Sequence, residues 1–413
     1  MLPWVLVGAS LAAKDRPIAK AETVGMSSER LAKLSAALDG YVERDKLAGA
    51  VVVIMRRGEV VFHQAFGQRD RAERDAMETS DIFRIASQSK ALVSAAIMIL
   101  QEDGKLLISH PVSRYLPSFE KTTVAEDRDD GRYEIVPAKR SITLRDLLTH
   151  TAGVSYGNGP TSHLWEKAEI QGWYFAHRSE PVRATIDRLA ALPFDAHPGE
   201  KFIYGYSTDI LGAVVEAASG KPLDQFLQTR LFDPLGMSDT HFYLPTDQAD
   251  RLAVVYSATE TGLVKAPDPG HMVGQGHYVN GPRQSFSGGA GLLSTAGDYA
   301  RFLQMMLGGG ELDGKRVLAR KTVELMTTNH VGDKLAWRGG VGFGLGFQVV
   351  LDVGATGEHG SVGEFGWGGA YHSTYWVDPK EELVVAYMTQ LIPAGGLDDH
   401  QTLRALVYSA IVD

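Results

Sequence analysis

Apolar and polar positions along the chain predict strands near both ends of the sequence and helices between them. Apolar residues three or four positions apart indicate helices, and runs of β-branched and aromatic residues indicate strands. The predicted helices cover residues 27–44, 142–148, 210–218, 299–303 and 400–411. The predicted strands cover residues 50–55, 60–66, 343–351, 371–377 and 383–388. This order predicts an α/β (α+β) fold, in which N- and C-terminal helices flank one antiparallel sheet and an all-helical lobe is inserted.

The same pattern predicts a discontinuous domain organisation. Residues 1–25 are expected to form an N-terminal tail or signal-like segment, residues 26–86 and 281–413 the sheet domain, and residues 87–280 a mainly helical domain. Residues 245–285 are rich in Gly, Pro and Asp and read as loops. Sites for small molecules favour clefts between lobes, so we expect the functional site at the junction of the two domains.

Charge and cysteine usage exclude several classes of function. The net charge of −9 comes from 41 basic and 50 acidic residues spread along the chain, which argues against a nucleic-acid or anionic-membrane partner. The chain has no cysteine, so disulfides, thiolate metal sites and a cysteine nucleophile are excluded. Its 13 histidines include no His-x-x-x-His pair, so no metal site is expected. We expect no cofactor either.

The N-terminus bears on localisation. Residues 2–13 are apolar and end in small residues, like the core and cleavage site of a signal peptide, which favours an exported or periplasmic protein. The segment lacks a positively charged start, so a loosely docked tail is the alternative. It is too short to span a bilayer, and no other segment is long enough, so we expect no membrane span.

Candidate chemistry is concentrated in residues 81–100. Ser87 precedes a strongly apolar, small-residue run that predicts a buried helix, and Lys90 lies one turn further on the same face. A serine hydroxyl needs a neighbouring group to remove its proton, and burial pushes an amine towards its neutral form. The helix N-terminus also favours an oxyanion formed beside it. An N-cap serine beside a snorkelling lysine is the alternative interpretation, and Ser118-x-x-Lys121 meets the same spacing without such a helix.

A nucleophilic Ser–Lys pair needs a third group that passes a proton to the leaving oxygen, and tyrosine suits this role. Tyr156-Gly-Asn and Tyr278-Val-Asn are literal Tyr-x-Asn matches. Tyr204 lies in a stronger context, a Pro-Gly turn followed by a tyrosine pair and a helix, over residues 198–212. Ser155 lies in a Gly-x-Ser-x-Gly pentapeptide, but the strand–serine–helix context of a nucleophile elbow is missing there, so we treat this match as coincidence.

Together these segments resemble the serine β-lactamase-like superfamily, which contains class C β-lactamases and DD-peptidases, and most closely family VIII carboxylesterases. The resemblance spans roughly residues 27–411. It is carried by Ser87-x-x-Lys90 and residues 142–153, 198–212, 234–237, 288–292 and 367–369.

The resemblance implies roles for several residues. Ser87 corresponds to the nucleophile, Lys90 to its partner, and Tyr204 to the general base and then acid, with Lys90 as direct base the rival account. Backbone N–H groups of Ser87 and Ala370 correspond to the oxyanion hole, and losing a single donor of such a hole typically costs about two to three powers of ten in rate. The expected substrate-binding residues are Tyr206, Trp367, Gly368 and Gly369.

Two departures from the family pattern bear on specificity. Tyr206 stands where the family has asparagine, and Trp367 stands where a lysine would anchor a substrate carboxylate. A site without that cation and with an added aromatic wall favours neutral esters. We therefore expect a serine carboxylesterase that hydrolyses short-chain esters through an acyl-enzyme, with a small-molecule ester as its partner. The alternatives are a β-lactamase or DD-peptidase, an acyltransferase, and a non-catalytic penicillin-binding module, which the intact Ser–Lys–Tyr set disfavours.

Overall fold

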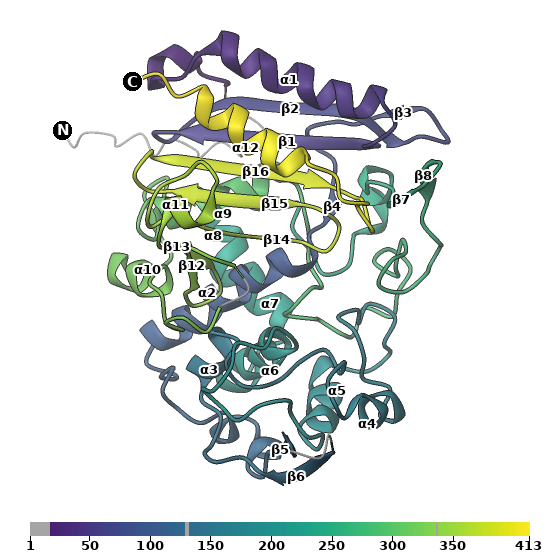
Figure 1. The fold of residues 1–413 in the computed structure, drawn as a ribbon, viewed down its shortest axis with the longest axis vertical. Helices are drawn as coiled ribbons and strands as arrows, with labels where there is room; N and C mark the ends of the chain where they lie inside the picture. Colours follow the sequence, from purple (N-terminus) through teal and green to yellow (C-terminus); the bar gives the residue numbers. More distant parts are fainter. Residues whose placement is uncertain (1–16, 129–131, 336–337) are drawn as a thin grey trace, which may run out of the picture.

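The computed structural model describes residues 17–128, 132–335 and 338–413, so the signal-like residues 2–13 lie outside it. Eight antiparallel strands form one sheet in the order β12-β13-β14-β15-β16-β1-β2-β3 (Figure 1). These strands are β1 Gly49–Arg56, β2 Glu59–Asp70, β3 Asp75–Ala76, β12 Val341–Phe343, β13 Gln348–Val350, β14 Phe365–Gly368, β15 Thr374–Asp378 and β16 Leu383–Thr389. The predicted α/β fold, with an antiparallel sheet built from both ends of the chain, is confirmed.

Helices pack on both faces of the sheet, and they form most of the part of the molecule remote from it (Figure 1). That part also contains the hairpin of β5 Thr123–Asp127 and β6 Tyr133–Pro137, so the inserted lobe is not all-helical as predicted. The helices are α1 Ser28–Glu43, α2 Ser89–Glu102, α3 Leu144–Leu148, α4 Ser162–Lys167, α5 Val182–Leu189, α6 Ser207–Ser219, α7 Leu223–Leu227, α8 Asp233–Leu235, α9 Ala296–Leu307, α10 Arg320–Met326, α11 Val353–Thr356 and α12 Asp399–Ser409. No helix in the described part of the chain has both the length and the apolar character needed to cross a membrane.

The two ends of the chain meet where β1 pairs with β16, in a register from Ala50↔Thr389 to Arg56↔Leu383. All eight residues of β1 are buried, because helices cover both faces of this central strand. Successive side chains of a strand point to opposite faces. Val51 and Val53 accordingly pack with α2 and α9, whereas Val52 and Ile54 pack with α1 and α12.

Local signals fix several helix ends. Ser27 caps α1 by accepting a hydrogen bond from the backbone N–H of Arg30. Thr143 and Asp146 form a reciprocal capping box at the start of α3. α6 ends at Gly220 in the left-handed conformation that glycine adopts without a steric penalty. These ends lie close to the predicted ones because each depends on residues within one turn.

Two segments differ from the predicted elements. The strand predicted over residues 343–351 is the β12–β13 hairpin, because Gly344 and Gly346 allow a turn closed by a hydrogen bond from Gly344 N–H to the Phe347 carbonyl. The loop predicted over residues 245–285 contains a second hairpin, β7 Tyr256–Thr259 with β8 Gly262–Lys265. Both hairpins are short, so their apolar period is too brief to read reliably.

Candidate active site

Ser87 lies in a single 3-10 turn, Ala86–Gln88, that leads directly into α2. Short β4 (Phe83–Arg84) precedes the turn and pairs with β9 (Leu293–Ser294). Every residue of α2 from Ser89 to Leu100 is buried, so the helix is held from all sides. The nucleophile candidate therefore lies on a rigid element, as the apolar run around it predicts.

Lys90 brings three groups together at its amine. Its Nζ donates to Ser87 Oγ at 3.2 Å, to Tyr156 OH at 3.0 Å and to the carbonyl of Gly289 at 2.7 Å. The ring centroid of Tyr204 lies 4.6 Å from the same nitrogen. Lys90 is only 2% exposed, so these contacts replace its water shell. The Ser–Lys spacing read from the sequence thus corresponds to a direct contact.

Two tyrosines meet Lys90 in different ways. Tyr156 accepts a hydrogen bond from the amine. Burial, with smaller contributions from Tyr204 and Asp209, raises the pKa of the Tyr156 phenol well above its ordinary value. Tyr204 presents its ring face to the amine, and its hydroxyl oxygen accepts a hydrogen bond from Trp367 Nε1 at 3.0 Å. Tyr278, the third tyrosine weighed from the sequence, is buried against Arg84 instead.

A chain of hydrogen bonds connects Lys90 to a buried carboxylate that sequence reasoning missed. The carbonyl oxygen of Gly289 accepts a hydrogen bond from Lys90. The N–H of the same peptide group, which belongs to Ala290, donates to Ser287 Oγ. The Ser287 hydroxyl in turn donates to Asp209 Oδ1 at 2.6 Å. Burial raises the pKa of Asp209, and the Lys90 ammonium offsets part of that effect. A charged residue in the first turn of an apolar helix was the available signal, but only the fold shows its partner.

β14 ends at Gly368 beside the turn that carries the nucleophile, and a further glycine, Gly369, follows it directly. A Cβ at Gly369 would lie 2.6 Å from the carbonyl oxygen of Ile85, closer than any ordinary contact. Glycine therefore permits the strand to approach the backbone that leads into Ser87. Ala370 follows at once and lines the same cavity as Ser87. The backbone oxyanion hole of Ser87 and Ala370 remains a prediction.

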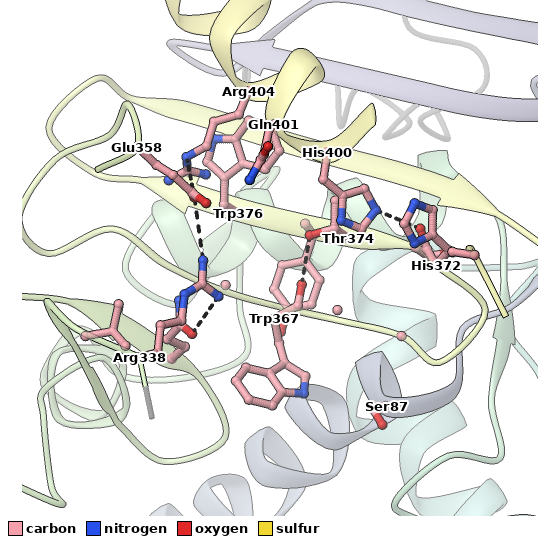
Figure 2. A pocket seen from close by; sticks show the side chains of 18 of the residues that line it. Ser87, Arg338, Glu358, Trp367, His372, Thr374, Trp376, His400, Gln401 and Arg404 are labelled. Carbon is pink, nitrogen blue, oxygen red and sulfur yellow. Dashed lines mark hydrogen bonds and ion pairs between the residues drawn. The ribbon is translucent and has the colours of Figure 1, made fainter. Parts of the chain in front are cut away.

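One cavity of about 840 Å³ contains the site. Its lining includes Tyr156, Tyr204, Trp173, Gly368 and Gly369. Ser87 and Trp367 also line it, and Figure 2 shows both. Tyr206 is absent from this lining. It is 1% exposed, stacks on Trp165 and donates to the Gly172 carbonyl.

Tyr206 therefore supports Tyr156 from behind, with the two ring centroids 5.0 Å apart, and does not reach the cavity. Its predicted contact with substrate has no counterpart in this geometry, because its aromatic ring completes the core where the family's shorter asparagine would stand. Ser155 is also buried, and its hydroxyl accepts from the N–H of Gly157.

His372, Asp399 and His400 form one group with potential metal-ligand atoms within 4.8 Å of one another. Asp399 accepts hydrogen bonds from His372 and from Tyr387, and His400 Nε2 lies 2.9 Å from the His372 carbonyl. The two imidazoles are stacked, with centroids 4.0 Å apart and planes 15° apart. An imidazole binds a metal in its ring plane, so parallel stacked rings are poorly arranged to share one ion. The group instead ties the turn after β14 to the start of α12.

The fold and the Ser–Lys–Tyr arrangement define a serine hydrolase of the β-lactamase fold. The family model described as Beta-lactamase matches residues 34–408, and the chain belongs to this family. The resemblance inferred from the sequence is thereby confirmed.

Characterised and uncharacterised relatives match over most of their length. An uncharacterised protein of Mycobacterium tuberculosis is 34% identical over 85% of this chain and 88% of its own. Esterase EstB of Burkholderia gladioli is 30% identical over 87% of this chain and 90% of its own. The solved structure of EstCE1, a hydrolase with promiscuous acyltransferase activity, matches with a TM-score of 0.82 and 29% identity, covering 92% of this chain and 99% of that one.

Proposed function

We propose that this protein is a carboxylesterase that hydrolyses short-chain esters through an acyl-enzyme on Ser87. The observation that carries the proposal is the position of Trp367. Its indole stands at the strand edge where the family resemblance places a lysine, and it donates to Tyr204 instead of offering a cation to a substrate carboxylate. Aromatic walls from Tyr156, Trp173 and Trp367 line the cavity beside the nucleophile and suit a neutral acyl group. Likeness to Esterase EstB and to the hydrolase EstCE1 supports the same activity.

The proposed steps use the side chains in the site. The first step requires Tyr204 as a phenolate. Ser87 Oγ attacks the ester carbonyl as this phenolate accepts its proton, and the N–H groups of Ser87 and Ala370 hold the oxyanion. Tyr204 then returns the proton to the leaving alcohol, and the acyl group stays on Ser87. Water attacks next, the acid leaves, and Ser87 regains its proton. Tyr204 suits proton transfer because the indole N–H stabilises negative charge on its oxygen, whereas the raised pKa of Tyr156 keeps that phenol neutral.

Paired substrates test this activity. We expect turnover of p-nitrophenyl butyrate to exceed turnover of nitrocefin, a β-lactam, because the site lacks the anchoring lysine. Ser87→Ala should abolish ester turnover, and Ser155→Ala, a buried serine outside the cavity, is the matched control. Faster cleavage of nitrocefin would establish the β-lactamase alternative. Product analysis in the presence of a small alcohol separates hydrolysis from acyl transfer, which is the promiscuous activity of EstCE1.

A further inference from the structure

The cavity at Ser87 continues past β14 into a second, polar region. This region, here called the outer groove, lies between α12 and residues 338–360 (Figure 2). Its polar and aromatic lining residues are Arg338, Glu358, Trp376, His400, Gln401 and Arg404. A cavity of about 840 Å³ falls in the range that accepts a drug-sized ligand, so a short alkyl ester fills only part of it.

Glycines leave the floor of the outer groove open. Gly366 pairs with Trp376 and Gly368 pairs with Thr374, so each glycine shares a face of the sheet with its partner. Trp367, between them, points to the opposite face and reaches Tyr204. No side chain of β14 covers that face at these two positions, and Thr374 and Trp376 of β15 line the cavity there. The region around Ser87 and the outer groove thus belong to one cavity that passes the end of β14.

The charges in the outer groove alternate in sign. Glu358 lies between two guanidinium groups, 3.5 Å from Arg338 Nη2 and 3.6 Å from Arg404 Nε. Arg338 also donates to Gln348 Oε1 at 3.2 Å. Arg404 is 14% exposed and is held further by Glu364, whereas Arg338 is 42% exposed and Glu358 is 32% exposed. The charged groups that a ligand can reach are therefore the guanidinium of Arg338, which offers several donors, and the neighbouring carboxylate of Glu358, which offers acceptors.

This pairing selects for a neutral, hydroxylated ligand. An anion near Arg338 would approach the carboxylate of Glu358, and a cation near Glu358 would approach two guanidinium groups. A hydroxyl both donates and accepts a hydrogen bond, so neighbouring hydroxyls can satisfy both charges. The amide of Gln401 adds another donor and acceptor.

We propose that the outer groove binds the sugar or polyol part of an ester whose carbonyl lies at Ser87, so that the substrate is an acylated carbohydrate. This inference rests on the proposed esterase activity. Ser87 Oγ forms a bond to the acyl carbon, the bond from that carbon to the sugar oxygen breaks, and the sugar hydroxyl leaves with the proton taken from Ser87. Water then releases the carboxylic acid.

The test compares two butyrate esters whose alcohols are similar in size, 6-O-butyryl glucose and hexyl butyrate, with butyric acid release measured in a pH-stat. We expect the native protein to show a higher kcat/KM for butyryl glucose. Arg338→Met and Gln401→Leu should each lower the ratio of the two kcat/KM values about tenfold, the effect of a lost hydrogen bond to a charged or polar group. Arg320→Met, a 66% exposed arginine on α10 outside the groove, should leave the ratio unchanged.

Two results would overturn the inference: equal or better cleavage of hexyl butyrate by the native protein, or an unchanged ratio in both groove variants. A separate binding measurement distinguishes failure of the groove from failure of the esterase. Butyryl glucose is titrated calorimetrically into Ser87→Ala and into Ser87→Ala carrying Arg338→Met. Binding weakened about tenfold by the second substitution supports the groove even if no ester is hydrolysed, and equal binding contradicts it.

Discussion

Replacing each of the two tyrosines at Lys90 by phenylalanine separates a proton carrier from a positioning group. Tyr204→Phe removes the hydroxyl that accepts from Trp367, and Tyr156→Phe removes the hydroxyl that accepts from Lys90. Both rings stay in place, because the hydroxyl is the only group lost. Ser87→Ala provides the background rate.

The expected losses of kcat differ because the Tyr204 hydroxyl is proposed to carry a proton, whereas the Tyr156 hydroxyl holds Lys90 in position. A positioned general acid–base contributes typically about 10²–10⁴-fold, so Tyr204→Phe should lower kcat for p-nitrophenyl butyrate by that factor. Tyr156→Phe removes one hydrogen bond to a charged amine, worth about 1.5–3 kcal/mol, or about 10- to 150-fold. We therefore expect the larger loss of kcat in Tyr204→Phe. The two expected ranges overlap at about 100- to 150-fold, so a second measurement is needed.

The solvent isotope effect on kcat distinguishes a proton carrier from a positioning group better than the rate alone. In the Tyr156→Phe variant the solvent isotope effect on kcat should match that of the native protein, because the proton carrier is intact. In Tyr204→Phe it should change. A larger rate loss and an altered isotope effect at Tyr156, with a nearly native Tyr204→Phe enzyme, would refute the assignment and make Tyr156 the proton carrier.

Three further substitutions test the surroundings of the site. Asp209→Asn keeps an acceptor for Ser287 but removes its charge, so kcat should fall about tenfold while circular dichroism stays native. Burial, with the Lys90 ammonium nearby, holds the pKa of His150 well below 6.5. Below pH 6.5 the His150 imidazole is therefore protonated in the unfolded chain but not in the native protein, so the free energy of unfolding falls as the pH drops. His150→Asn, which tolerates the positive φ there, should therefore show a smaller loss of urea midpoint between pH 8 and 5.5. Gly369→Ala should lower kcat/KM at least tenfold by pushing the strand away from Ile85, and an unchanged value would show that this approach is unnecessary.

The sequence anticipated elements whose signals are local. The helix α1, the β1–β2 hairpin and α12 follow from apolar spacing and from end signals within a few residues. Strand β14 gave no such signal, because Phe-Gly-Trp-Gly alternates large apolar side chains with glycines, which disfavour strands in isolation. Only pairing with β13 and β15 makes it a strand.

For the site, the sequence by itself determined that Ser87 and Lys90 share one face of a buried helix start, because three-residue spacing fixes that geometry. The sequence also placed Trp367 and Tyr204 in segments that resemble active-site motifs of the serine β-lactamase-like superfamily. Only the tertiary structure brought Tyr156 to the amine, removed Tyr206 from the cavity and connected Asp209 to Lys90. These contacts join residues tens to hundreds of positions apart, and their distances depend on how the sheet and helices pack, which no local pattern encodes.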